Sequence, residues 1–160
     1  MIAATVLTVL QLQPLCWADR GAARKPAQLA IVAEAIAEAS PTPERAAYLI
    51  AVGWHESRWC LRVHSAAHRG PGRGLWQLEG KRGKLPGPFV GLSLFETSNA
   101  AAVASDVLSR SHQCGSTPAE VFTAYAGRPC GSTWATLNSR VQTYYWALGA
   151  LHRAGNHEQQ

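Results

Sequence analysis

The stretch AAYLIAVGWHESRWC, residues 46–60, is the one around which we expect the rest of the chain to fold. A carboxylate on the inward face of a helix is costly while it stays charged and unpaired, so it tends to hold its proton. A carboxyl that keeps its proton near neutral pH can act as a general acid, which makes Glu56 the first candidate catalytic residue. Glu56 is placed on the inward face by helical periodicity, because its neighbours on that face are apolar or small. This face carries Leu49, Val52, Gly53, Glu56 and Cys60.

Glu56 also has a structural interpretation, as a buried glutamate held by an arginine such as Arg58 or Arg140. Most other acids lie at helix starts, on solvent-facing helix positions or near the chain ends, and Glu79 in a glycine-rich segment is the exception. Two carboxylates are typical of glycoside hydrolysis, in which one is the acid and the other the base or nucleophile. One carboxyl is enough where the substrate supplies its own nucleophile.

The length of 160 residues, with 47% hydrophobic and 16% charged residues, predicts one globular domain with a substantial core. Lys and Arg total 15 against 10 Asp and Glu, a net charge of +5 with His neutral. Many of the basic residues lie between positions 58 and 84, where they would attract an anionic polymer such as cell wall, nucleic acid or a membrane surface. A solvated basic loop without a partner is the alternative.

Residues 2–10 are apolar, but the run is too short to predict a transmembrane helix. It fits either the core of a leader cleaved near residue 18 or a buried helix of the mature fold, and no Lys or Arg precedes it. We favour export to the periplasm, the extracellular space or, from a phage, the cell wall, without stable membrane insertion. We divide the chain into a leader or N-terminal segment with its connector (1–25), a catalytic domain (26–152) and a polar tail (153–160).

Periodicity and cap signals predict a mainly helical chain. We expect helices over 27–39, from Pro43 behind a Thr42 cap, over 93–111, over 117–126 and from about Trp134. Capping boxes are predicted at 93–96 and 117–120. Residues 62–92 are rich in Gly and Pro and predict an irregular lobe that could contain a short hairpin.

The four cysteines allow three disulfide connectivities. Cys114 and Cys130 bracket one short helix, which makes a bridge between them plausible, and Cys60 could then pair with Cys16 if that residue is retained. The competing interpretation is zinc binding, but no CxxC pair is present. His64 and His68 have the spacing of metal ligands on a helix, but glycines at positions 70, 72 and 74 disfavour a helix there, so we expect no metal site.

Three short motifs follow one another in a recognisable order: Glu56-Ser57, then Gly74-Leu75-Trp76-Gln77, then Thr123-Ala124-Tyr125-Ala126-Gly127. Together with residues 94–100 they resemble the lytic transglycosylase branch of the lysozyme-like superfamily, over roughly residues 43–150. The resemblance implies a mainly α, α+β lysozyme-like fold. A helical domain and a small irregular or hairpin-containing lobe would then flank a groove for glycan strands.

The resemblance also implies a reaction, the cleavage of the β-1,4 bond between N-acetylmuramic acid and N-acetylglucosamine in peptidoglycan. Glu56 would protonate the leaving oxygen and then take the muramyl O6 proton, which leaves an anhydro sugar end. We expect no cofactor, a monomer, peptidoglycan glycan strands as the partner and no nucleic acid. The substrate-binding residues carried over are Ser57, Trp76, Gln77, Tyr125 and Tyr145.

The chain departs from the family pattern at three positions. No Asn stands between Tyr125 and Ala126, Trp76 replaces a Met or small apolar residue, and Glu79 follows soon after Gln77. Glu79 keeps open a hydrolytic muramidase, a lysozyme or endolysin, that uses two carboxylates, and the missing amide keeps open a wall-binding protein that does not cut. Outside enzymes, the basic segment 70–84 could make this a nucleic-acid-binding module.

Four of the motif residues have plain structural alternatives. Ser57 could be a hydroxyl on a helix surface and Gln77 an amide within a turn. Tyr125 could be a core aromatic residue and Trp76 a packing residue of the lobe.

Overall fold

The computed structural model describes residues 2–12, 26–59, 72, 74–78 and 87–157. The mainly helical class predicted from the sequence is confirmed there. Short 3-10 turns lie at η3 (Gly87–Phe89) and η4 (His112–Cys114). The α-helices are α1 (Ile2–Leu12), α2 (Pro26–Ala39), α3 (Pro43–Ser57), α4 (Thr97–Ser111), α5 (Pro118–Tyr125) and α6 (Leu137–His157).

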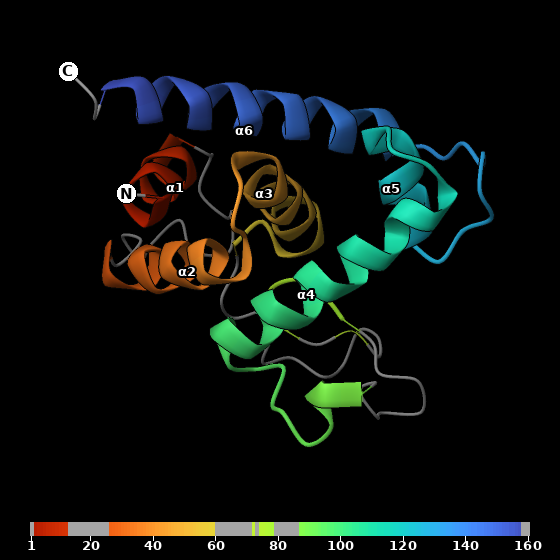
Figure 1. Cartoon of the computed structure of the whole chain (residues 1–160), viewed down its shortest axis with the longest axis horizontal. Helices are drawn as coiled ribbons and strands as arrows, with labels where there is room; N and C mark the ends of the chain where they lie inside the picture. Colours follow the sequence, from red (N-terminus) through yellow and green to blue (C-terminus); the bar gives the residue numbers. More distant parts are fainter. Residues whose placement is uncertain (1, 13–25, 60–71, 73, 79–86, 158–160) are drawn as a thin grey trace.

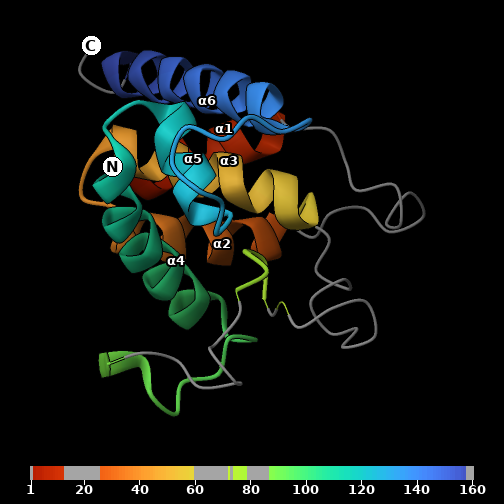
Figure 2. The same ribbon diagram turned by 90° about the vertical axis from the view of Figure 1, so that its right-hand side faces the viewer.

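Helix α3 is the central helix of the bundle. It contacts α1, α2, α4 and α6. The long α6 runs across α3 and also contacts α1 and α5 (Figures 1 and 2). Every residue from Ala46 to Gly53 is buried, so the apolar surface goes around the whole helix and is wider than the single face expected from periodicity. A helix enclosed in this way places its last turn at the edge of the core, and Glu56 lies in that turn.

Both ends of α3 follow from local chemistry. Thr42 caps the start by accepting the N–H of Arg45, and Pro43 is the first helical residue, as predicted. At the other end Arg58 adopts a left-handed conformation (φ 52°) and donates its N–H to Trp54 O at 2.9 Å. The helix therefore stops directly after Ser57, and the chain turns back towards it.

This turn brings the Trp59 ring onto Gly53. A Cβ atom at position 53 would lie only 2.4 Å from the Trp59 ring, so the close approach requires glycine. Trp76 lies against the same place, with its Nε1 donating to Leu49 O at 2.9 Å and its ring edge-on to Trp59 at 6.1 Å. The two indoles fix the segment 74–78 against the side of α3.

The helix predicted from residue 93 begins later, at Thr97, and the capping box predicted at 93–96 does not form. Glu96 is the N-cap but makes no capping bond, and its carboxylate accepts a hydrogen bond from Asn99 instead. Leu94 is buried, and a Cβ atom added at Gly74 would lie 2.3 Å from Leu94 O. This packing against segment 74–78 accompanies the later helix start.

The capping box predicted at Thr117 and Glu120 is confirmed, with both reciprocal hydrogen bonds present. The predicted disulfide between Cys114 and Cys130 is also confirmed, with a Cα–Cα distance of 5.4 Å. Helix α6 begins at Leu137, three residues after the predicted Trp134, since Leu137 N–H donates to Trp134 O in a turn.

Helix α1 packs against α2 and α6 and buries Val6, Val9 and Leu10. None of the helices in the described ranges is long and apolar enough to cross a membrane. Several predictions lie outside the described residues and stay predictions: the roles of Cys16, Cys60, Glu79, His64 and His68, and the hairpin within 62–92.

Candidate functional site

Three of the predicted site residues line one cavity. Glu56 comes from the last turn of α3, Gln77 from the turn at 74–78 and Tyr125 from the end of α5. The cavity has a volume of about 340 Å³. Its lining among the described residues is Glu56, Gln77, Leu78, Val107, Tyr125, Ala126 and Gly127.

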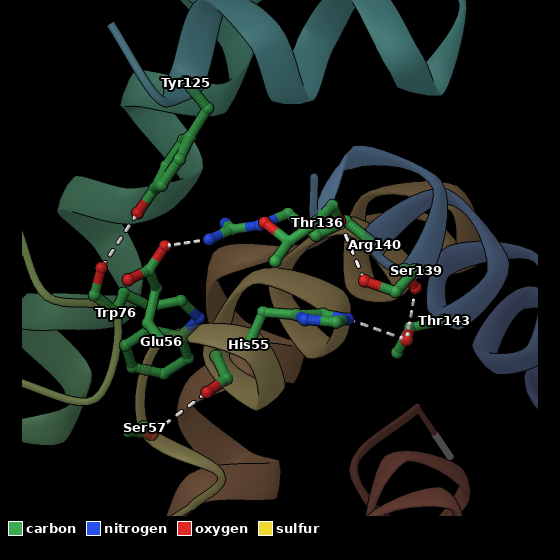
Figure 3. Close-up of polar contacts among 10 residues, drawn as sticks. His55, Glu56, Ser57, Trp76, Tyr125, Thr136, Ser139, Arg140 and Thr143 are labelled. Carbon is green, nitrogen blue, oxygen red and sulfur yellow. Dashed lines mark hydrogen bonds and ion pairs between the residues drawn. The ribbon is translucent and has the colours of Figure 1, made fainter. Parts of the chain in front are cut away.

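Glu56 forms an ion pair with Arg140 of α6. Arg140 Nη2 donates to Glu56 Oε1 at 2.7 Å, and the side chains are 10% exposed for Arg140 and 25% for Glu56 (Figure 3). The structural interpretation of Glu56 is therefore realised with Arg140. The other arginine considered, Arg58, lies over the Trp54 ring at 5.1 Å. Within the described residues, Glu56 Oε2 accepts no hydrogen bond.

Tyr125 connects the second and third motifs. Its hydroxyl donates to Trp76 O at 3.2 Å, which ties the end of α5 to the turn at 74–77 (Figure 3). Burial raises the pKa of the Tyr125 hydroxyl well above its ordinary value, and the negative charge of Glu56 raises it further. The phenol therefore stays protonated at neutral pH and remains a donor at the cavity wall.

Gln77 has both of the roles considered for it. Its backbone is in the left-handed region (φ 48°), and its Nε2 donates to Gly74 O at 2.9 Å, so the amide supports the turn. The same side chain lines the cavity with Glu56. The turn therefore presents an amide whose position is already fixed.

Ser57, which is also predicted to bind substrate, does not line the cavity. Its side chain is buried; the hydroxyl donates to Gly53 O at 3.0 Å (Figure 3) and accepts the Trp59 N–H at 3.2 Å. The hydroxyl is occupied in ending α3. Its role is to support the turn that follows Glu56.

Trp76 and Tyr145, which are also predicted to bind substrate, do not line this cavity. Trp76 is fully buried, so its ring offers no face to a sugar. Tyr145 is 58% exposed and stacks edge-on against Tyr144, which packs on Tyr48 near the start of α3. The sequence showed only that one residue is an aromatic within a motif and the other a tyrosine in the last helix. Neither observation could show whether the side chain lines the cavity.

No protein-family model, curated protein or solved structure matches this chain. The cavity and its side chains are therefore the basis for assigning a function. The described residues contain no group of three or more His, Cys, Asp or Glu side chains that could hold a metal ion.

A second, larger cavity of about 510 Å³ lies between α3 and α6. His55 lines it and shares a hydrogen bond with Thr143 Oγ1 at 3.0 Å, pointing away from Glu56 (Figure 3). Burial lowers the pKa of His55, and the nearby charge of Arg140 lowers it further, so the imidazole is neutral at neutral pH. None of the predicted site residues that the structure describes lines this cavity, so we take the smaller one as the candidate site.

Sequence reasoning did not identify Arg140 as a site residue beyond its pairing with Glu56, and it missed the contacts around it. The guanidinium of Arg140 lies over the Trp134 ring at 5.0 Å, and that of Arg128 lies over the same ring at 5.2 Å. The available signal was the inward glutamate itself, because a buried carboxylate calls for a cation.

Proposed function

We propose that this chain cleaves the glycan strands of peptidoglycan and that Glu56 is its acid and base. The observation that supports this is the convergence of Glu56, Gln77 and Tyr125 on one cavity, although they lie far apart in the sequence. These are residues to which the resemblance to lytic transglycosylases assigns a cleft. The chain is mainly helical, as the resemblance also implies.

The two oxygens of Glu56 differ in a way that suits proton transfer. Oε1 is held by Arg140, whereas Oε2 accepts no hydrogen bond from any described residue. The reacting proton would lie on Oε2 and pass to the glycosidic oxygen as its bond to C1 of the muramyl sugar breaks. The carboxylate then takes the proton of the muramyl O6 hydroxyl while that oxygen bonds to C1. The products are a free sugar hydroxyl on one fragment and an anhydro end on the other.

Tyr125 and Gln77 would hold the sugar beside Glu56. The Tyr125 oxygen can accept a hydrogen bond from a sugar hydroxyl while its own O–H donates to Trp76 O. A cavity of about 340 Å³ is at the small end of the range for ligand sites, so it suits one or two sugar rings. The rest of the strand would run outside it.

The proposal includes the compartment in which the reaction takes place. A cell-wall substrate places the protein outside the cytoplasm, and the Cys114–Cys130 disulfide is of the kind that persists there. The chemistry uses no cofactor and needs one copy of the chain.

The direct test is the rate at which soluble fragments are released from purified peptidoglycan. Glu56→Gln keeps the shape of the side chain and an oxygen that can accept from Arg140, but it cannot donate or accept the reacting proton. We expect its rate to fall by at least about 100-fold. Glu34→Gln, an exposed glutamate on α2, is the matched control and should cleave like wild type. Equal rates for Glu56→Gln and wild type would contradict the proposal.

A further inference from the structure

The guanidinium of Arg140 is buried, yet it uses little of its hydrogen-bonding capacity on the protein. Its Nη2 binds Glu56, while Nε and Nη1 have no hydrogen-bond partner among the residues that the structure describes. Buried donors without partners are costly, and an arginine that served only to fill the core would be poorly suited to this place. Within the described part of the chain, the contact with Glu56 is therefore the one hydrogen-bonded interaction that this side chain makes.

Trp134 supports the guanidinium in place of further hydrogen bonds. Its ring lies 5.0 Å from the Arg140 guanidinium carbon, a distance that gives a favourable cation–π contact. The segment that carries Trp134 follows directly after Cys130, which is joined to Cys114 by the disulfide. The stack fixes where the positive charge lies relative to Glu56.

The Glu56 carboxyl is 25% exposed and lies in direct contact with the Arg140 guanidinium. A cation beside a carboxyl in general favours the charged form of that carboxyl. Among the described residues, the neighbouring groups from other elements add no further full charge in hydrogen-bond contact with Glu56. Tyr125 of α5 is a neutral phenol, His55 on the same helix is neutral and faces Thr143, and Arg58 stacks on Trp54.

We propose that Arg140, supported by Trp134, is a positioning residue that holds Glu56 Oε1 and sets the pH range in which Oε2 carries the reacting proton. Its effect on catalysis rests on the proposed function. Its effect on the charge of Glu56 does not, and it can be measured in the absence of any substrate.

The first test is a titration of the glutamate carboxyl carbons by ¹³C NMR, with the Glu56 signal assigned from its loss in Glu56→Gln. In Arg140→Met, which keeps an unbranched side chain without the charge, we expect the Glu56 midpoint to rise by about one pH unit or more. Arg128→Met is the matched control, because Arg128 stacks on the same ring without contacting Glu56, and its midpoint should stay near that of wild type. An unchanged midpoint in Arg140→Met, or an equal rise in Arg128→Met, overturns the proposal.

The second test is the pH dependence of glycan cleavage. A general acid must be protonated, so activity falls as pH rises, and in Arg140→Met this falling limb should move to higher pH. Arg140→Lys, which keeps the charge, should restore the limb towards wild type even if its maximum rate is lower. If Arg140→Met loses the same fraction of its cleavage rate at every pH, Arg140 has a structural role only and the proposal is overturned.

The two tests separate this inference from the proposed function. A midpoint that moves in a protein that cuts no peptidoglycan supports the role of Arg140 and rejects the cleavage. A wild type that cuts while the midpoint stays unmoved in Arg140→Met supports the cleavage and rejects the role of Arg140.

Discussion

Arg140 and Glu56 lie 84 positions apart in the sequence, and the guanidinium Nη2 of one donates to the carboxylate Oε1 of the other at 2.7 Å. This contact joins the last turn of α3 to the first turns of α6 at the edge of the core. It leaves one carboxylate oxygen of Glu56 beside a cavity that Gln77 and Tyr125 also line. Proton transfer by Glu56 requires this difference between Oε1, which Arg140 holds, and Oε2, which is left to react.

Tyr125→Phe removes the hydrogen bond to Trp76 O and leaves that carbonyl without its partner at the cavity wall. We expect the free energy of unfolding to fall by about 1 kcal/mol. The rate of glycan cleavage should fall as well, because the turn that carries Gln77 loses its tie to α5. Urea unfolding and the fragment-release assay measure the two effects. Tyr145→Phe, on an exposed side chain, is the control; if both variants lose the same activity, Tyr125 has no special place at the site.

Trp76→Phe tests whether the buried indole serves packing or sugar binding. The change removes the hydrogen bond to Leu49 O and leaves space beside Trp59, so we expect a loss of about 2 kcal/mol in unfolding free energy. The concentration of glycan needed for half-maximal rate should stay near that of wild type at a temperature where the variant is folded. A large rise in that concentration without a loss of stability would show that Trp76 contacts substrate.

The capping box of α5 should make stability depend on pH. The Thr117 hydroxyl, and then the Thr117 N–H, hold the pKa of Glu120 below its ordinary value. A carboxyl whose pKa is lower in the folded state stabilises the fold above its unfolded pKa, and this contribution is lost as the pH falls through the folded pKa. Thr117→Ala should therefore lower the free energy of unfolding at neutral pH and lower it less in acid.

Urea unfolding of Thr117→Ala and wild type near neutral pH and again at about pH 3 checks this sign. Ser93→Ala is a useful comparison, because the box predicted there does not form, and its effect should be small at both pH values. A cost for Thr117→Ala that grows towards acid pH would contradict the assignment.

The disulfide closes a loop with a sequence separation of 16 between Cys114 and Cys130. A crosslink of this length lowers the entropy of the unfolded chain by an amount worth about 3 kcal/mol. Cys114→Ser with Cys130→Ser should lower the melting temperature by several degrees, measured by circular dichroism. Adding a reductant to the double variant should cause no further drop if this is the bridge that matters; a large further drop would assign the stabilisation elsewhere.

Features set by adjacent residues were predictable from the sequence. The start of α3 at Pro43, the capping box at Thr117 and the bridge between Cys114 and Cys130 all depend on chemistry within a few residues or around one short helix. The predicted start of the helix at Ser93 was wrong. Leu94 there is buried with its carbonyl against Gly74, a contact between distant segments that local patterns do not contain.

In the candidate site, too, local features were predictable and contacts between distant segments were not. The inward position of Glu56 was visible in the helical period, and that glutamate needs a partner, but the choice between Arg58 and Arg140 depends on how α6 crosses α3. The motif order indicated Gln77 and Tyr125, whereas it could not show that the Trp76 ring faces the core or that Ser57 closes the end of α3. Which side chains face a cavity is settled by packing between elements.

The central claim is tested most directly by digesting purified peptidoglycan with wild type and with Glu56→Gln and reading the new chain ends by mass spectrometry. The account predicts anhydro-muramyl ends from wild type and none from Glu56→Gln. Reducing ends from wild type alone would keep Glu56 as the acid but replace the O6 hydroxyl by water. Identical fragments from both proteins, or no cleavage by wild type on any wall type, would contradict the assignment of Glu56 as the catalytic acid and base.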